Sequence, residues 1–253
     1  MKKLDKKVVF ITGGLSGIGL ACAIASGEEG ALVAIADLDK NDKDTSMNEI
    51  RKTCKDAIFI ACDVSDFYAV EKVVAHVINV FGRIDVALNN AGIGGHASKM
   101  GDMSEHDWLE VVNVNFNGVF NCMKHELKQM SQQKSGVIVN MSSILGVVGF
   151  ASSSHYSAAK HGVIGMTQTA ALEYATEGIR VNAICPGFIE TPLLEKGGIT
   201  GQQEVLDHIV GLHPMKRLGM PEEIARGFVF LASDDSSFMT GTCVEMDGGF
   251  LSW

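Results

Sequence analysis

Seven short apolar runs recur along the chain, and segments with helical periodicity separate them. The runs are continuous rather than alternating, as in strands that are buried on both faces of a parallel sheet. Between two runs, residues 66–81 place valines and isoleucine at helical spacing. This alternation predicts a single α/β domain over 1–253, a doubly wound sheet of about seven parallel strands with helices on both faces. The runs are 7–12, 31–37, 57–64, 84–92, 136–143, 179–187 and 241–249.

Charge and cysteine content exclude several classes of partner. The formal net charge of -9 repels phosphate backbones and anionic lipid surfaces, so neither nucleic acid nor a membrane is expected as a partner. The six cysteines form no C-x-x-C pair and no cluster with zinc-ligand spacing, so no metal site is expected. A chain of 253 residues buries a large core without disulfides, and a reducing cytoplasm is the expected setting.

The N-terminus resembles a signal peptide or a membrane span at first reading. A basic heptapeptide precedes residues 8–27, which carry no charge. That stretch holds five glycines together with Thr12, Ser16 and Ser26, a composition that is poor for a continuous apolar helix. We therefore interpret it as part of the folded domain, and its glycine spacing as functional.

The stretch "TGGLSGIG" (12–19) follows the first predicted strand and opens a helix. Glycines at 13, 17 and 19 let the backbone turn tightly and approach a ligand, and the helix N-terminus then presents free N–H groups to a pyrophosphate. Asp37 ends the second strand, eighteen residues after Gly19, where a carboxylate can accept both hydroxyls of an adenosine ribose. Together these features predict a dinucleotide site with the spacing G-x-x-x-G-x-G.

A second candidate feature is the pair Tyr156 and Lys160 in "HYSAAKH". Four residues apart on a helix, a phenol and an ammonium lie on one face as neighbours. A phenol with an ordinary pKa of about 10 exchanges protons poorly near neutrality, and a nearby cation favours the phenolate. A tyrosine and a lysine at this spacing are common on solvated helices, so the other motifs must decide whether the pair has a catalytic role.

Taken together, the glycine turn, "NNAG" (89–92), "YSAAK" (156–160) and "PG" (186–187) resemble the short-chain dehydrogenase/reductase family, in its order and spacing. The resemblance runs from the first strand to "DGG" (247–249). It implies a Rossmann fold and an NAD-dependent enzyme, a carbonyl reductase or alcohol dehydrogenase. Such an enzyme transfers a hydride between a nicotinamide and a ketone or secondary alcohol.

The resemblance assigns four catalytic residues. Tyr156 is the general acid for ketone reduction and the base for alcohol oxidation. Ser143 stands thirteen residues before the tyrosine, which selects it over Ser142, and hydrogen-bonds the carbonyl oxygen. Lys160 lowers the pKa of the phenol and holds the nicotinamide ribose. Asn115 positions a water that passes protons onward from Lys160.

The remaining cofactor contacts follow from the same resemblance. Asp37 predicts NAD rather than NADP, because a 2′-phosphate would meet a carboxylate and only Lys40 lies nearby as a cation. Asp63 and Val64 are expected at the adenine and Asn90 beside the adenosine ribose. The full expected set is Gly13, Leu15, Ser16, Gly17, Ile18, Gly19, Asp37, Leu38, Asp63, Val64, Asn90, Ala91, Gly92, Tyr156, Lys160, Pro186, Gly187, Ile189 and Thr191.

Residues 188–213 form the longest stretch without a clear strand, and we expect them to be a substrate lid, called the lid below. The segments that reach the catalytic tyrosine are apolar, which favours hydrophobic ketones over sugars or acids. Glycines at 94, 95, 197 and 198 are expected to leave both pocket edges flexible. The expected pocket residues are Ile93, Ile144, Leu145, Phe150, Phe188 and Leu193.

Several alternatives stay open at this point. A 3-oxoacyl thioester reductase of fatty-acid synthesis would carry basic residues for an acidic carrier protein; Lys134 fits one such place, but Glu177 lies near the other. A dinucleotide-binding sensor without chemistry would lack the serine, tyrosine or lysine, and all three are present. The resemblance also implies a homotetramer that pairs helices 104–131 and 155–177 and buries Trp253. His155 is expected at the pocket edge, and the natural substrate and the hydride face stay open.

Overall fold

The computed structural model describes residues 2–39, 42–197 and 201–252. Seven parallel strands form one sheet in the order β3-β2-β1-β4-β5-β6-β7, which confirms the predicted fold class. Each strand falls inside one of the predicted apolar runs. The strands are β1 (Val8–Thr12), β2 (Leu32–Asp37), β3 (Ile58–Ala61), β4 (Val86–Asn89), β5 (Gly136–Met141), β6 (Ile179–Pro186) and β7 (Cys243–Met246).

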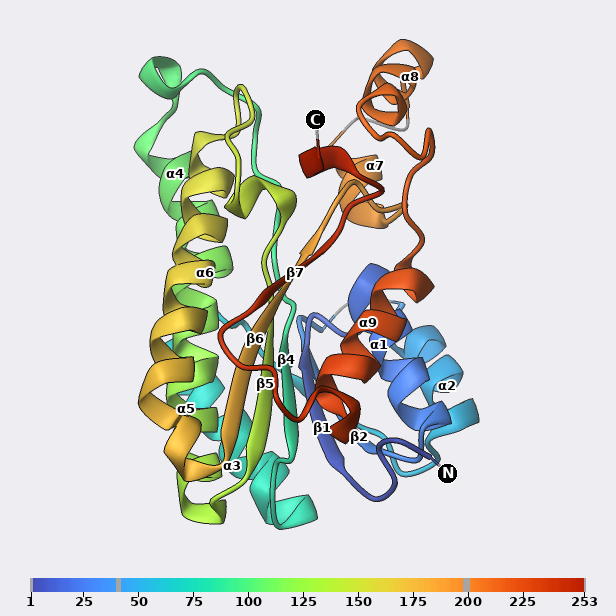
Figure 1. Ribbon diagram of the computed structural model, residues 1–253, viewed down its shortest axis with the longest axis vertical. Coiled ribbons are helices and arrows are strands. Elements are labelled where there is room, and N and C mark those ends of the chain that lie inside the picture. Colours follow the sequence, from blue (N-terminus) through green and yellow to red (C-terminus); the bar gives the residue numbers. More distant parts are fainter. Residues whose placement is uncertain (1, 40–41, 198–200, 253) are drawn as a thin grey trace.

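Helices cover both faces of this sheet (Figure 1). On β1, Val9 and Ile11 face the core shared with α1 and α9, whereas Val8 and Phe10 face the core shared with α3, α5 and α6. Both faces are buried, which explains why the strand sequences read as unbroken apolar runs. The helices are α1 (Gly17–Glu28), α2 (Lys43–Thr53), α3 (Phe67–Phe81), α4 (Glu105–Val112), α5 (Gly118–Gln133), α6 (Ser154–Tyr174), α7 (Pro192–Lys196), α8 (Gln203–Gly211) and α9 (Pro221–Ala232).

The predicted helix 104–131 is divided in the structure. A π-helical segment, Asn113–Asn117, separates α4 from α5. Such segments add a residue to a helical turn and occur mainly at functional sites. Within the described ranges, no helix is both long and apolar enough to span a bilayer.

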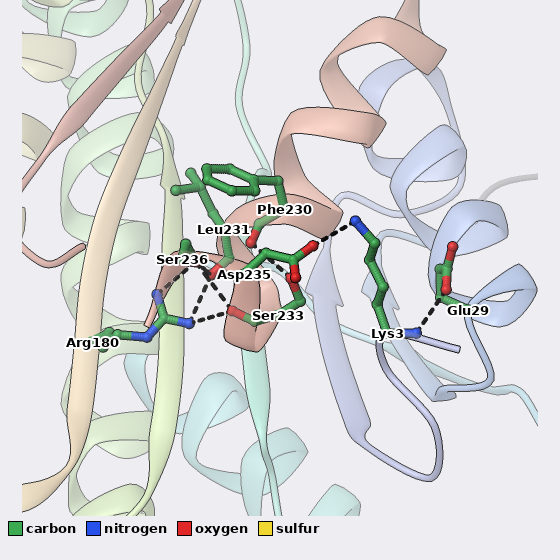
Figure 2. A network of polar contacts seen from close by, with 8 residues as sticks. All are labelled: Lys3, Glu29, Arg180, Phe230, Leu231, Ser233, Asp235 and Ser236. Carbon is green, nitrogen blue, oxygen red and sulfur yellow. Dashed lines mark hydrogen bonds and ion pairs between the residues drawn. The ribbon is translucent and has the colours of Figure 1, made fainter. Parts of the chain in front are cut away.

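Arg180 on β6 fastens the C-terminal end of α9 to the sheet (Figure 2). Its guanidinium donates to the carbonyl oxygens of Leu231 at 3.0 Å and Ser233 at 2.9 Å, and to the Ser236 hydroxyl at 3.0 Å. These carbonyls lie at the negative end of the helix, where a cation is favoured. Burial lowers the pKa of Arg180 from its usual value, so these oxygens replace part of its lost hydration.

A carboxyl group is buried between α5 and the sheet. Glu126 is 0% exposed, and its Oε2 atom accepts from Asn89 Nδ2 at 3.0 Å. Asn89 Nδ2 also donates to Asn140 Oδ1 at 3.0 Å. Among the described residues, Glu126 Oε1 has no hydrogen-bond partner. Burial raises the pKa of Glu126 to about 8, and the bond from Asn89 opposes the shift, so the protein carries a neutral carboxylic acid here at pH 7.

We expect Glu126 to make the protein less stable as the pH rises. Because the folded-state pKa lies above the unfolded one, the free energy of unfolding falls between about pH 4.5 and about pH 8. Glu126→Gln cannot ionise, so its thermal midpoint relative to the wild type should rise steadily across that window, measured by circular dichroism. The exposed Glu110→Gln is the control and should follow the wild type. Parallel pH curves for wild type and Glu126→Gln would contradict the assignment.

Candidate active site

The site lies where the strand order reverses, at the carboxyl ends of β1 and β4. The chain leaves these adjacent strands in opposite directions, which opens a crevice above the sheet. Thr12 Oγ1 accepts from the backbone N–H groups of Asn90 at 3.1 Å and Ala91 at 3.2 Å. Asn90 Nδ2 donates in turn to the Gly13 carbonyl at 3.0 Å. Asn90, expected beside a ribose, therefore also fixes the glycine turn to β4.

The glycine turn has the shape that a diphosphate needs. Gly13 and Gly17 have φ values of 65° and 52°, a region that favours glycine. A Cβ at Gly19 would overlap the Gly13 carbonyl oxygen, and one at Gly17 would lie 3.2 Å from Thr191 of the lid. The turn thus opens α1 with its N–H groups directed at the crevice and brings the lid against it, an arrangement suited to an anion.

Asp37 ends β2 beside this turn. Its Oδ2 accepts from the Leu15 N–H at 3.1 Å and its Oδ1 from the Leu38 N–H at 2.8 Å. The residue is 6% exposed, so the turn itself orients the carboxylate. Val64 is also buried, and its carbonyl accepts from Asn121 Nδ2 at 2.9 Å. The carboxylate of Asp63 accepts from the Ser65 hydroxyl at 2.7 Å.

Asn115 lies in the π-helical segment and is 0% exposed. Its side-chain amide makes two 2.8 Å bonds to Ile93, one from the Ile93 N–H and one to the Ile93 carbonyl. A Cβ at Gly92 would lie 3.2 Å from Asn115 Oδ1 and 3.7 Å from Lys160 Nζ. Asn115, Gly92 and Lys160 therefore meet at one point, and the distorted helix is what aims Asn115 there.

Lys160 is buried on α6 with 3% of its surface exposed. Its Nζ donates to the Met141 carbonyl at 2.7 Å and lies 5.6 Å from the centroid of the Tyr156 ring. Burial lowers the pKa of Lys160 to about 8, and the Cys185 thiol opposes this shift. The tyrosine and the lysine are neighbours, as the spacing predicts, but the end of β5 holds the ammonium.

The phenol differs from the sequence-based expectation. Burial raises the pKa of Tyr156, and a hydrogen bond with the Ser143 side chain partly opposes the rise. The predicted lowering by Lys160 is therefore wrong for this structure, because desolvation is the larger effect and the ammonium is directed at Met141. Ser142 instead donates to the Lys160 carbonyl at 3.0 Å, which supports Ser143 as the serine at the reaction centre.

The lid begins at the end of β6 and contains α7 and α8. The ring centroids of Phe188 and Phe150 lie 5.8 Å apart, so the lid contacts the loop that follows β5. His213 joins the two ends of the lid: its Nε2 accepts from the Phe188 N–H at 3.3 Å, and its Nδ1 lies 2.9 Å from the Ile209 carbonyl. The lid glycine at 198 lies outside the described residues.

The structure places the six expected pocket residues in two groups. Ile93, Phe150, Phe188 and Leu193 keep exposed surface around the crevice. Ile144 and Leu145 are 1% and 7% exposed and lie in the core beneath the catalytic loop, so they have little surface to offer a substrate. They sit in a 3₁₀ turn that packs against α6, which their apolar character alone did not indicate.

One further residue at the site was not predicted there. Phe250, close to the C-terminus, lies 6.1 Å from Phe188 and 5.5 Å from His213, ring centroid to ring centroid. An aromatic residue just after "DGG" was the available signal. His155, expected at the pocket edge, is 1% exposed and contacts the segment after β4. A cavity of about 850 Å³ is lined by α8, α9 and the segment between them, and no predicted catalytic residue lines it.

Comparison with known proteins agrees with this geometry. A family model described as enoyl-(acyl carrier protein) reductase matches residues 13–251. The 3-oxoacyl-(acyl-carrier-protein) reductase FabG of Thermotoga maritima is 42% identical over 98% of this chain and 99% of its own length. The chain belongs to the short-chain dehydrogenase/reductase family. Cyclohexanol dehydrogenase of an Acinetobacter species is 38% identical over 99% of this chain and 97% of its own.

Solved structures of this family superpose closely on the chain. The crystal structure of levodione reductase matches with a TM-score of 0.94 and 38% identity, covering 97% of this chain and 98% of that one. ElxO with NADP bound has a TM-score of 0.91 at 37% identity over 98% and 100% of the two chains. NAD+-bound xylitol dehydrogenase has a TM-score of 0.93 at 35% identity over 98% and 100%. The chain is therefore an oxidoreductase of a family whose members bind nicotinamide dinucleotides.

Proposed function

We propose that this protein is an NAD(H)-dependent oxidoreductase that interconverts hydrophobic ketones and secondary alcohols. The proposal rests on the arrangement of Ser143, Tyr156 and Lys160. The Ser143 side chain acts on the phenol of Tyr156, which lies beside the buried Lys160. They stand at the carboxyl edge of the sheet, next to a glycine turn suited to a diphosphate. The bound nicotinamide supplies the hydride in reduction and accepts it in oxidation.

The protein's own groups handle the oxygen and its proton. In reduction, the Ser143 hydroxyl donates to the substrate carbonyl oxygen as negative charge develops there. The Tyr156 hydroxyl gives its proton to that oxygen, and in oxidation it takes the proton back. A phenol whose pKa is raised by burial is fully protonated at neutral pH, which suits the acid role. Lys160, held by the Met141 carbonyl, stabilises the phenolate that remains.

The first test removes the proton donor. Tyr156→Phe keeps the ring and its packing but has no hydroxyl, so kcat for ketone reduction should fall by about 10²–10⁴-fold. NADH binding, followed by fluorescence titration, should be unchanged. Tyr174→Phe, on the same helix, is the matched control and should keep wild-type kcat. A Tyr156→Phe enzyme with near wild-type kcat would refute the mechanism.

The cofactor proposal depends on Asp37. A 2′-phosphate at its carboxylate would place two anions together, and the adjacent positions hold Leu15, Ser16 and Leu38 rather than a cation. Lys40 lies outside the described residues, and Lys43 is paired with Asp39 at 2.6 Å. We infer NAD(H) on this charge argument, since structural neighbours bind either dinucleotide.

We therefore expect a higher kcat/KM with NADH than with NADPH. Asp37→Asn removes the charge while keeping one of the two acceptor oxygens, and it should raise kcat/KM for NADPH by about tenfold or more. Asp56→Asn, exposed in the turn before β3, is the control and should leave the NADPH value unchanged. A wild-type preference for NADPH would overturn the proposal.

The substrate class is inferred from the apolar surface around the crevice. Ile93, Phe150, Phe188 and Leu193 offer a carboxylate or phosphate nothing to pair with. The relative named cyclohexanol dehydrogenase acts, by its name, on an uncharged alicyclic alcohol, which supports the same class here. We expect activity with aryl and alicyclic ketones in a panel that also holds diketones, acetoacetyl thioester, keto acids and ketoses, followed by NADH absorbance. Activity confined to the charged or polyhydroxylated members would contradict the assignment.

A 3-oxoacyl thioester reductase is the second candidate, supported by the relative of that name at 42% identity. Against it, Lys134 forms a 3.0 Å ion pair with Glu177, so its charge is already matched. Activity confined to the acetoacetyl thioester would favour this candidate. Turnover of any carbonyl would exclude the non-catalytic sensor.

The assembly and its setting remain proposals based on the family. Among the apolar residues of the helices expected to pair, Val111, Val119 and Val163 are in the core, while Phe120 is 48% exposed. Leu172 on α6 and Leu109 on α4 are also exposed, which supports burial of these helices in a homotetramer. Trp253, expected at such an interface, lies outside the described residues. The six cysteines are free, which suits the proposed reducing cytoplasm.

A further inference from the structure

We propose that His155 is a positioning residue that sets the width of the substrate pocket. It does so by holding the segment after β4, residues 93–98, against the catalytic helix; this segment is called the rim below. The inference rests on the proposed ketone-reductase function for its meaning, although the contact itself can be tested without a substrate.

The rim is bonded at both ends and at one point between them. At its start, Asn115 makes two bonds to the backbone of Ile93. At its end, the Ser98 N–H donates to the Ser152 carbonyl at 3.0 Å. Between these points, His155 Nε2 lies 3.1 Å from the His96 carbonyl oxygen. The middle of the rim is therefore joined to α6 through the residue immediately before the catalytic tyrosine.

The hydrogen bonds of His155 define its tautomer. Nδ1 accepts from the Tyr156 backbone N–H at 2.8 Å, so this nitrogen carries no proton. The partner of Nε2 is a carbonyl, which only accepts, so Nε2 carries the proton and donates it. Both ring nitrogens of this buried side chain are satisfied by one neutral form. The imidazole thus satisfies an N–H in the first turn of α6 and a rim carbonyl together.

Glycine at position 95 allows the rim to reach the imidazole. Gly95 has a φ of 72°, and a Cβ there would collide with Val111 and with the His155 ring. The sequence suggested that this glycine leaves the pocket edge flexible. Its position instead indicates close packing, because the backbone of the rim lies directly against His155 and α4.

The rim in turn lies beside the lid. A Cβ built at Gly94 would lie 3.8 Å from Leu193 Cδ1, ordinary van der Waals contact, and Leu193 belongs to α7. Leu193 of the lid therefore lies beside a rim whose distance from Tyr156 is set by His155. A rim released from His155 would widen the space in which a ketone must be held for proton transfer, without altering the glycine turn or the catalytic side chains.

The test compares three variants on two ketones, cyclohexanone and a bulkier aryl ketone. His155→Leu removes the bond to His96 and also the acceptor of the Tyr156 backbone N–H. The loss of the bond to His96 should raise KM for cyclohexanone by about tenfold, with a smaller rise for the bulkier ketone. The kcat should change by less than about threefold, and NADH affinity should be unchanged. His155→Gln can place an N–H near the same carbonyl and should recover most of the loss.

His161→Leu is the matched control, because His161 lies on the same helix, is exposed, and bonds only the Ser157 carbonyl among the described residues, at 2.8 Å. It should keep wild-type KM values. Wild-type KM in His155→Leu, or a Gln variant as impaired as the Leu variant, would overturn the inference.

Amide hydrogen exchange tests the contact independently of activity. Exchange in residues 93–98 should quicken by about tenfold in His155→Leu, but not in His161→Leu. Gly95→Ala displaces the rim while the residue at position 155 stays a histidine, and it should give the same exchange pattern. This variant keeps the test valid if His155→Leu folds poorly. Unchanged exchange of residues 93–98 in both His155→Leu and Gly95→Ala would refute the inference. If the wild type reduces no ketone while the exchange result holds, the proposed function fails and the positioning role stands.

Discussion

The structure depends on the divergence of the chain at the ends of β1 and β4. These parallel strands are neighbours, yet the connections that follow them run to opposite faces of the sheet. No backbone covers the ends of such a pair, so a crevice forms there without any special sequence. Hydrogen bonds between Thr12, Asn90 and the glycine turn fix the floor of the crevice. The candidate dinucleotide-binding and catalytic residues are arranged around this crevice.

Burial decides the chemistry of the charged groups near the sheet. Lys160, Arg180 and Glu126 are all removed from water, and each has its pKa shifted toward the neutral form. The two cations recover part of their hydration from backbone carbonyls at the end of a strand or a helix. Glu126 has only a neutral amide donor at Oε2, so it keeps its proton instead. The same desolvation raises the pKa of Tyr156 and outweighs its lysine neighbour.

The edges of the pocket are held by polar side chains rather than left loose. Asn115 and His155 bind the backbone of the rim, and His213 binds both ends of the lid. Glycines at these places allow close approach, because a side chain at position 95 would collide with α4 and α6. Pocket shape and catalytic geometry are thus coupled through α6, which carries His155, Tyr156 and Lys160 together.

The sequence by itself determined the fold class and the seven strands, and it indicated the candidate catalytic and glycine motifs. Apolar periodicity reports whether one or both faces of a strand are buried, and a spacing of four places Tyr156 beside Lys160 on any helix. Only the tertiary structure decided that Lys160 points to Met141, that Ile144 and Leu145 are core residues, that His155 bonds the His96 carbonyl, and that Phe250 packs against Phe188. These outcomes depend on contacts between segments distant in sequence, and on the burial those contacts create. Local sequence patterns contain no information about these contacts or about the burial.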